Sequence, residues 1–351
     1  MRLGYHTGYW SAGPPPGAAE AVRDADRLGL DSVWTAEAYG SDAFTPLAWW
    51  GSATSRVRLG TAVAQIAART PTATAMAALT LDHLSGGRFT LGLGVSGPQV
   101  VEGWYGLPYP RPLARTREFV AIVRDVLRRE APVRADGEFY RLPLPEGEGS
   151  GLGKALRSTV HPLRADLPIH LAAEGPRNVA LAAEIADGWL PLFCTPRLDG
   201  EMRELLAEGF ARRAAGTRPV EEFEVTATVP VVLAPDVETA ADAVRPFVAL
   251  YAGGMGARGA NFHANALERL GYGEACAEIQ AHYRAGDRAR AAAAVPTELV
   301  QDIALVGPPD AVRAQARAWE STVVTTLLVQ ASPEQLPDIA ALLGPGAPTD
   351  G

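Results

Sequence analysis

The stretch Ile169-His170-Leu171-Ala172-Ala173-Glu174-Gly175-Pro176-Arg177-Asn178 changes character halfway along. Its first half, Ile169–Ala173, is an apolar run of the length expected for a buried strand. Pro176 follows Gly175, and proline suits the first turn of a helix because its φ is already fixed at a helical value. An alanine-rich stretch continues over Arg177–Ile185. The segment therefore predicts a strand that passes directly into a helix, which is one βα unit.

The same alternation of short apolar runs and longer amphipathic stretches extends along the chain, which is typical of a parallel sheet covered by helices. The predicted strands are Arg2–His6, Ser32–Ala36, Val57–Val63, Arg88–Leu93, Ile169–Ala173, Trp189–Phe193, Val225–Leu233 and Thr325–Gln330. The predicted helices include Ala18–Leu28, Pro71–Leu84, Arg115–Glu130, Arg177–Ile185, Pro235–Tyr251 and Asp310–Glu320. Eight such units favour a closed (β/α)8 barrel, a TIM barrel, over an open doubly wound sheet, which stays the rival topology.

Two segments interrupt the repeat, and we expect both to be insertions in a single domain that covers residues 1–343. Residues 131–167 are rich in proline, glycine and charge, with a hairpin-like sequence at Asp136–Tyr140. Residues 253–306 form a second long excursion. In compact barrels such segments are usually active-site lids or contacts between subunits. Residues 344–351 are predicted to be a disordered tail.

Composition narrows the class of partner. The 351 residues carry a formal charge of −8, which argues against nucleic acid or an anionic membrane as the main partner. The two cysteines, Cys194 and Cys276, have neither CxxC nor histidine-ligand spacing, so no metal site is predicted. No apolar stretch is long enough to span a bilayer, and no signal-peptide pattern opens the chain. We expect a cytoplasmic protein that acts on a small molecule.

Active sites of such barrels lie at the carboxyl ends of the strands. His6 and Glu37 each end a predicted strand, so each is a candidate acid–base group. Polar side chains that only satisfy the rim of a barrel would be found at the same places. The residues alone leave both readings open.

The turn after the strand Ile169–Ala173 is a candidate anion site. A helix that begins at Pro176 would leave the N–H groups of Arg177 and Asn178 without intrahelical acceptors, and Arg177 would add a positive charge. Gly175 would let the backbone come close to a phosphate. The alternative is an ordinary helix start with no ligand.

The run Gly92-Leu93-Gly94-Val95-Ser96-Gly97 is weak as a motif on its own. It matches neither the dinucleotide fingerprint nor a P-loop, so it can equally be a strand whose glycines admit a neighbouring backbone or a planar ligand. No serine elbow, zinc motif or cysteine–histidine pair stands at a productive place in the sequence. Chemistry at this site would therefore depend on a cofactor.

Taken together, several motifs resemble those of the bacterial luciferase-like superfamily, and within it the oxidoreductases that use the deazaflavin coenzyme F420. The matching stretches are Leu59–Val63, Leu84–Phe89, Gly92–Trp104, Ala172–Pro176, Ala186–Trp189 and Gly307–Pro309. They cover most of residues 1–195 and are more specific for the superfamily than for its F420 branch.

The resemblance implies roles for individual residues. The third strand of this family carries a non-prolyl cis peptide behind the deazaflavin ring, which would fall at Ala62-Val63. The residues implied to contact the cofactor are Ala62, Val63, Gln65, Ser96, Gly97, Glu174, Gly175, Pro176, Arg177 and Asn178. Glu37 and Gln65 would lie near the ring edge, and Gly175, Arg177 and Asn178 would hold the phosphate. The resemblance also implies a homodimer.

There is one departure from the family pattern. Members that oxidise sugar phosphates have an Asp-His pair after the second strand, whereas this chain has Glu37-Ala38. The sequence is more similar to the reductase branch, so we expect hydride transfer from F420 to an activated C=C or C=N bond, with Glu37 or His6 assisting a proton. The alternatives are an FMN-dependent monooxygenase of the same fold and a catalytically silent, cofactor-binding partner subunit.

Overall fold

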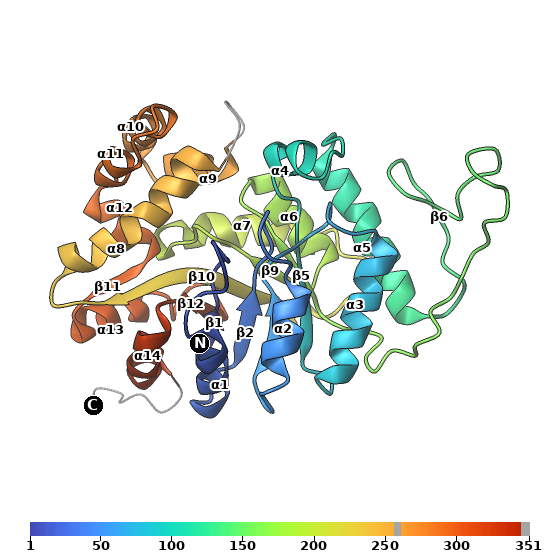
Figure 1. The fold of residues 1–351 in the computed structure, drawn as a ribbon, viewed down its shortest axis with the longest axis horizontal. Helices are drawn as coiled ribbons and strands as arrows, with labels where there is room; N and C mark the ends of the chain where they lie inside the picture. Colours follow the sequence, from blue (N-terminus) through green and yellow to red (C-terminus); the bar gives the residue numbers. More distant parts are fainter. Residues whose placement is uncertain (256–260, 345–351) are drawn as a thin grey trace.

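The computed structural model describes residues 1–255 and 261–344. Within these residues, eight parallel strands form a closed barrel, which confirms the predicted fold (Figure 1). The barrel strands are β1 (Arg2–His6), β2 (Ser32–Thr35), β3 (Arg58–Thr61), β5 (Phe89–Gly94), β8 (Ile169–Ala172), β9 (Gly188–Leu190), β10 (Glu224–Leu233) and β12 (Thr326–Gln330). β10 closes the barrel because its first residues pair with β9 and its middle residues pair with β12.

The predicted strand ends are close to the observed ones, with two exceptions. The strand predicted over Trp189–Phe193 ends at Leu190. The strand predicted over Val57–Val63 stops at Thr61, and a separate short strand, β4 (Ala64–Gln65), pairs with β5. The interruption falls at the Ala62–Val63 peptide, which is cis.

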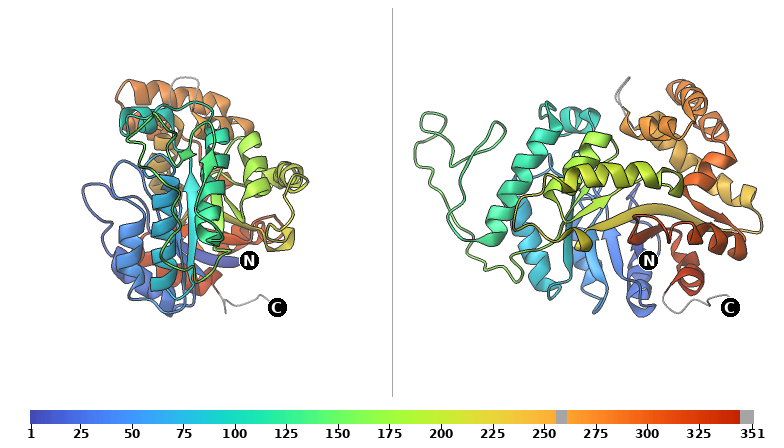
Figure 2. Two further views of the ribbon diagram at one scale, coloured as in Figure 1. Left: turned by 90° about the vertical axis from the view of Figure 1, so that its right-hand side faces the viewer. Right: turned by 180° about the vertical axis from the view of Figure 1, so that it is seen from behind.

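Helices surround the barrel on its outside (Figure 2). They are α1 (Ala18–Arg27), α2 (Phe44–Gly51), α3 (Pro71–Leu84), α4 (Pro98–Gly103), α5 (Pro112–Arg128), α6 (Pro176–Ile185), α7 (Asp199–Phe210), α8 (Val237–Ala249), α13 (Pro309–Arg317) and α14 (Leu336–Leu343), with short 3-10 turns η1 (Pro196–Leu198), η2 (Val220–Glu222) and η4 (Pro333–Gln335). No helix in the described ranges is long and apolar enough to cross a membrane.

The excursion over residues 253–306 is mostly helical. It contains α9 (Phe262–Arg269), α10 (Gly273–Arg284), α11 (Arg288–Ala293) and α12 (Thr297–Ile303), followed by the strand β11 (Leu305–Gly307). These helices share a second apolar core with α8 and with the π-helix η3 (Leu250–Gly254) that extends it. β11 pairs with the last residues of β10, which run beyond the barrel. The sequence of this excursion opens with Gly253-Gly254-Met255-Gly256, of which Gly256 lies outside the described residues.

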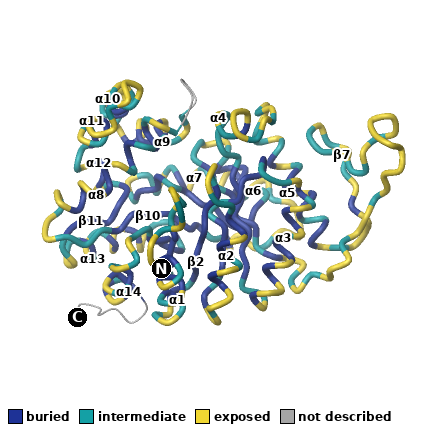
Figure 3. Tube along the Cα trace, in the orientation of Figure 1, coloured by how far each residue is buried: buried dark blue, intermediate teal, exposed yellow. Residues whose placement is uncertain are grey.

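The excursion over residues 131–167 has a different character. Its predicted hairpin is present as β6 (Ala135–Asp136) and β7 (Arg141–Leu142). The rest forms an extended arm without helix that projects beyond α5, and Figure 3 shows it largely exposed. In the expected disordered tail, Gly344 is described, and residues 345–351 lie outside the described residues.

Two aromatic rings fill the barrel interior. Trp34 and His170 stack with their centroids 5.7 Å apart, and both are almost completely buried. Glycines make room for them, since a Cβ on Gly60 would lie 2.2 Å from the Trp34 ring and one on Gly188 would lie 2.6 Å from the His170 ring. Above Trp34 pack Leu190, Leu328 and the interrupted third strand. Side chains therefore fill the interior beneath the carboxyl end of the barrel.

This packing leads to a stability prediction. Gly60→Ala should lower the free energy of unfolding by at least about 2 kcal/mol, because its methyl group would overlap the buried Trp34 ring. Urea unfolding measures the loss. Gly103→Ala is the matched control, because a Cβ there meets nothing within 4 Å. In a Trp34→Leu background the cost of Gly60→Ala should shrink, and equal costs in both backgrounds would contradict this account of the interior.

Candidate functional site

The parallel strands end together at one rim of the barrel, which we call the C-terminal rim. The Ala62–Val63 cis peptide lies there, where the family resemblance placed it. The carbonyl groups of Ala62 and Val63 are held by residues at the ends of β1 and β2. His6 Nε2 lies 3.2 Å from the Ala62 oxygen, and the Glu37 N–H donates to the Val63 oxygen at 3.0 Å. We call this fixed feature the bulge.

His6 is buried, and both of its ring nitrogens are in use. Nδ1 accepts the Gly8 N–H at 3.0 Å, so Nε2 carries the proton and donates it to Ala62. Burial lowers the pKa of His6 to about 4, so the ring is neutral near pH 7. His6 was a candidate acid–base residue. In this geometry it holds the bulge and has no nitrogen left for a substrate.

Glu37 is likewise buried and engaged. One carboxylate oxygen accepts the Gln65 N–H at 2.8 Å, and the other pairs with Arg69 at 2.8 Å. Arg69 also lies over the Phe44 ring. The sequence gave no signal for Arg69, because its partner is 32 positions away in the chain. The ion pair favours a positioning role for Glu37 over proton transfer.

Gln65 is fixed by the same loop after β2. Its Nε2 donates to the carbonyls of Glu37 and Ala38 at 3.0 and 3.1 Å. Its Oε1 is buried and has no hydrogen-bond partner among the described residues. A buried amide oxygen without a partner is costly. Oε1 is therefore an acceptor available to a ligand N–H group beside the bulge.

The glycines of β5 admit the bulge and its neighbouring backbone. A Cβ on Gly92 would lie 1.8 Å from the Thr61 oxygen, and one on Gly94 would lie 2.5 Å from a Val63 methyl. After the strand, Ser96 has a φ of 59°, which is rare for a residue other than glycine. Tyr109 donates to the Ser96 carbonyl at 2.9 Å and holds this loop. Of the two explanations for the glycines of Gly92–Gly97, the close approach of a neighbouring backbone is therefore correct at Gly92.

The helix α6 begins as predicted at Gly175-Pro176, beside the loop that follows β5, because β5 and β8 are paired. One detail of the predicted anion site is wrong. The Asn178 N–H donates to the Gly175 carbonyl at 2.9 Å, so it is not free for a ligand. Pro176 has no N–H. The Arg177 N–H and its exposed side chain remain, and nothing lies within 4 Å of where a Gly175 Cβ would stand.

Glu174 turns away from this helix start. Its carboxylate accepts the Leu192 N–H at 2.9 Å, and its carbonyl accepts from Arg269 of the helical excursion at 2.8 Å. Burial raises the pKa of Glu174 to about 7. Because the Glu174 carboxyl group points inward, it does not repel an anion bound at the start of α6. These contacts make Glu174 a structural residue of the C-terminal rim. The resemblance had instead grouped it with the residues that contact the cofactor.

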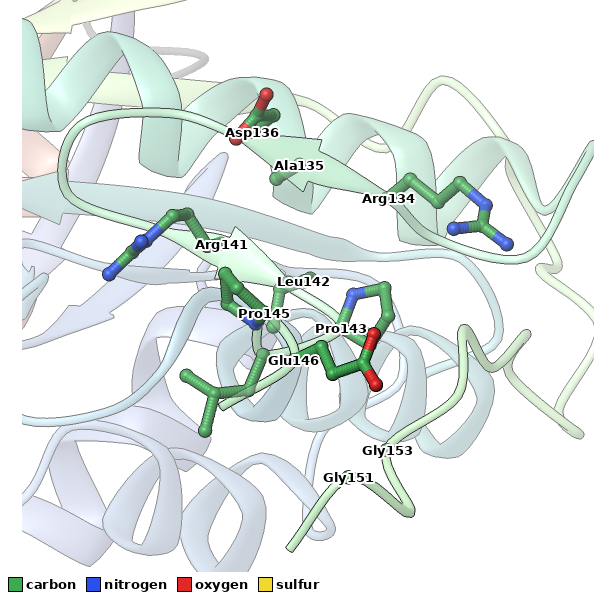
Figure 4. A pocket seen from close by; sticks show the side chains of 11 residues that line it. Arg134, Ala135, Asp136, Arg141, Leu142, Pro143, Pro145, Glu146, Gly151 and Gly153 are labelled. Carbon is green, nitrogen blue, oxygen red and sulfur yellow. The ribbon is translucent and has the colours of Figure 1, made fainter. Parts of the chain in front are cut away.

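A hollow lies away from this rim. A cavity of about 640 Å³ opens between the hairpin and the arm, lined by Arg134, Arg141, Leu144 and Glu146 among others (Figure 4). None of the predicted site residues lines it. Arg141 is also held by a bidentate pair with Glu148. The rim is the better candidate site, because there the bulge, the unpartnered Gln65 oxygen and the start of α6 lie on neighbouring strands.

Comparison with known proteins agrees with this reading. The model of the luciferase-like monooxygenase family matches residues 3–326. A Mycobacterium tuberculosis protein, provisionally named a coenzyme F420-dependent oxidoreductase, is 59% identical over 345 residues, which are 98% of this chain and 99% of that protein. This chain belongs to the luciferase-like monooxygenase family.

Solved structures share the fold. The F420-dependent tetrahydromethanopterin reductase of Methanopyrus kandleri has a TM-score of 0.79 at 23% identity and covers 98% of both chains. An F420-dependent secondary alcohol dehydrogenase, solved with an F420–acetone adduct, has a TM-score of 0.77 at 17% identity and covers 100% of this chain and 99% of its own. At these identities the likeness shows the fold alone.

The raised pKa of the half-buried Glu174 predicts a pH dependence of stability. Its folded pKa of about 7 lies above the ordinary value of 4.5, so the unfolded state loses this proton first and stability falls as pH rises between these values. Glu174→Gln should remove a penalty of about 3 kcal/mol at about pH 8 and have little effect near pH 5.

Urea unfolding at both pH values measures this. Asp26→Asn is a control of opposite sign, because backbone hydrogen bonds from residues 55–57 hold the pKa of Asp26 below its usual value. Its loss of stability should be largest at the higher pH and fade in acid. An equal effect of Glu174→Gln at both pH values would contradict the assigned pKa.

Proposed function

We propose that this chain is an F420-dependent oxidoreductase that transfers a hydride between the deazaflavin and a small organic substrate. The observation that carries the proposal is the arrangement of the rim, where the bulge of β3–β4 and the start of α6 flank β5. Membership of the luciferase-like family and the name of the 59% identical relative support it.

The residues of the rim fit such a cofactor. Val63, facing Gly94, would give the ring a platform, and the unpartnered Gln65 oxygen would accept one of its N–H groups. Ser96 and Gly97 would lie along the chain that joins ring and phosphate. The Arg177 side chain and N–H, at the positive end of α6, would hold the phosphate. When bound, F420 supplies a carbon centre that exchanges a hydride and reacts poorly with oxygen.

For the substrate we propose an activated C=C or C=N bond. The rim lacks the Asp-His pair after β2, and Glu37 in that place is committed to Gln65 and Arg69. Glu37 and His6 therefore keep the bulge rigid, so that a bound ring would be presented in one orientation. Because both side chains are already hydrogen-bonded, the proton that the reaction needs would come from another group.

We also propose that the chain forms a homodimer through α2 and α3, which pack side by side. Trp49 on α2 is 78% exposed, and Met76 and Leu84 on α3 are 62% and 74% exposed. α2 has no charged residue, and the Asp82 carboxylate of α3 is buried against Arg164. An outer helix normally has a charged solvent face, so an apolar one indicates a covered surface.

Cofactor titration tests the proposed function. Purified protein should change the absorbance and fluorescence of F420 on binding, and Arg177→Ala should weaken binding roughly tenfold, because it removes a charge-assisted contact to phosphate. Arg23→Ala on α1 is the control for loss of a surface charge. Tight binding of FMN with oxygen consumption, and none of F420, would instead indicate a monooxygenase. Binding of F420 without turnover of any enone or imine would indicate a silent partner subunit.

The dimer is tested by molar mass in solution. Trp49→Glu with Met76→Glu should give a monomer, because two carboxylates would be buried in the interface. Val220→Glu, at another exposed apolar residue, should leave the mass of the wild type. Light scattering after size exclusion measures this, and a double variant that keeps the dimer mass would exclude α2 and α3 as the contact.

A further inference from the structure

The arm is fixed at both ends and stands free between them. At its hairpin end, the Glu118 carboxylate on α5 accepts the Phe139 N–H at 2.9 Å. Where the arm returns to the barrel, the Val133 N–H donates to the Leu156 carbonyl at 2.8 Å. We call residues 143–155, which lie between these two points, the outer arm. Figure 1 shows this part of the chain projecting away from the barrel, beyond α5.

Leucines on the outer arm and at its base are left uncovered by their own chain. Leu152 is 85% exposed, Leu156 is 66% exposed and Leu144 is 53% exposed. Burial of a leucine side chain stabilises a protein, and each of these three side chains forgoes most of that gain. Isolated exposed leucines are ordinary, but several on one short segment indicate a surface that another molecule covers.

The backbone of the outer arm is rich in glycine. Glycine occupies every second position at Gly147, Gly149, Gly151 and Gly153. Because glycine loses more conformational entropy on ordering than any other residue, a defined path for this segment costs more free energy than the path of an ordinary loop. Glycines in an extended segment also let a neighbouring backbone come close. Contacts with another molecule would offset the entropic cost.

The base of the arm lies against the end of α3. His83 Nε2 is 2.7 Å from the His161 carbonyl oxygen. Leu84, which follows His83, is 74% exposed, and Val160 and Leu163, on either side of His161, are 45% and 50% exposed. The uncovered apolar surface of α2 and α3 therefore continues onto the arm, and we call this surface the apolar belt. Its residues are Trp49, Met76, Leu84, Leu144, Leu152, Leu156, Val160 and Leu163.

The area of the apolar belt fits a second copy of this chain. A specific protein–protein interface buries about 800 Å² on each partner. A large side chain buries at most about 250 Å². The exposed apolar side chains on α2 and α3, which are Trp49, Met76 and Leu84, therefore fall short of this area even when fully buried. The leucines of the arm would supply the missing apolar area.

Symmetry and charge both place the arm on the partner subunit. In a two-fold dimer, one face of each subunit meets the same face of the other. Because the base of the arm lies at the end of α3, which is the edge of that face, the outer arm would extend past its own subunit and over the second one. In the described part of the chain, Lys154 and Arg157 are exposed and have no carboxylate partner. A second copy, with its formal charge of −8, offers these cations a negative surface.

We propose that the arm lies across a second copy of this chain, with Leu152 and Leu156 packed on its surface and Lys154 beside one of its carboxylates. The inference rests on the homodimer proposed above and adds the contact that completes it. It does not depend on the cofactor. Burial of the leucines would stabilise the dimer, and the dimer in turn would fix the path of the glycine-rich outer arm.

Cross-linking tests where the arm lies, because Lys154 is the only lysine in the chain. A water-soluble carbodiimide joins an amine to a carboxylate in contact with it, forming an amide while the carbodiimide takes up the water. Isotopically light and heavy chains, mixed and left to exchange subunits, should give a covalent dimer in which a light peptide is joined to a heavy one at Lys154. Mass spectrometry identifies this link. Lys154→Arg is the matched control, since it keeps the charge without the primary amine, and it should lose the link.

Substitution tests the apolar contact of the arm. Leu152→Asp should raise the dissociation constant of the dimer at least tenfold, because a carboxylate would be buried against the partner. Sedimentation equilibrium of the full chain measures this constant. Val220→Asp, at an exposed apolar residue of η2, is the control and should leave it unchanged. Since the Leu152 side chain is almost uncovered, the variant should fold like the wild type, which circular dichroism checks.

The outcomes separate this inference from the proposals made above. A wild type that stays monomeric, or a dimer that survives Trp49→Glu with Met76→Glu, would defeat the proposed homodimer and this inference with it. If that double variant separates the dimer, then an unchanged dissociation constant for Leu152→Asp, or no link between subunits at Lys154, would overturn this inference alone. The arm would then belong to a partner other than this chain. F420 binding is measured separately and decides only the cofactor.

Discussion

The packing of Trp34 inside the barrel is the constraint on which the rest of the rim depends. A barrel of eight strands has an interior just wide enough for side chains to fill, so its centre must be solid. Here one indole, stacked on His170, occupies space that glycines on the neighbouring strands leave open. The bulge rests on Trp34 and on Leu190 and Leu328. Its height and orientation are therefore set by a residue that no ligand would touch.

Polar residues at the rim divide into two groups. His6, Glu37 and Arg69 spend their hydrogen-bonding capacity on the backbone and on each other, which fixes the bulge from two neighbouring strands. The Gln65 oxygen and the start of α6 keep theirs for a ligand. Rigidity and recognition are thus supplied by different side chains, which is how a preorganised site avoids reorganising when its ligand arrives.

The helical excursion has a second role besides its own core. It brings the rings of Tyr251 and His263 against Phe193, which follows β9, and Arg269 ties it to the turn after β8. Because the β10 strand continues past the barrel to pair with β11, the excursion is anchored to the same sheet that forms the site. The rim therefore has a wall built from a part of the chain that the barrel repeat does not need.

The sequence by itself determined the barrel, its helices and the start of α6, because these follow from local periodicity and from short motifs within one βα unit. The place of the bulge followed only from the resemblance to the family. It placed His6 and Glu37 at strand ends and left their roles open. Only the tertiary structure paired Glu37 with Arg69, turned Glu174 inward and occupied the Asn178 N–H. Most of these contacts unite residues far apart in the chain, and closure of the barrel decides which strand ends become neighbours. The one local exception, the Asn178 hydrogen bond, depended on how tightly the first turn of α6 was wound, which composition does not specify.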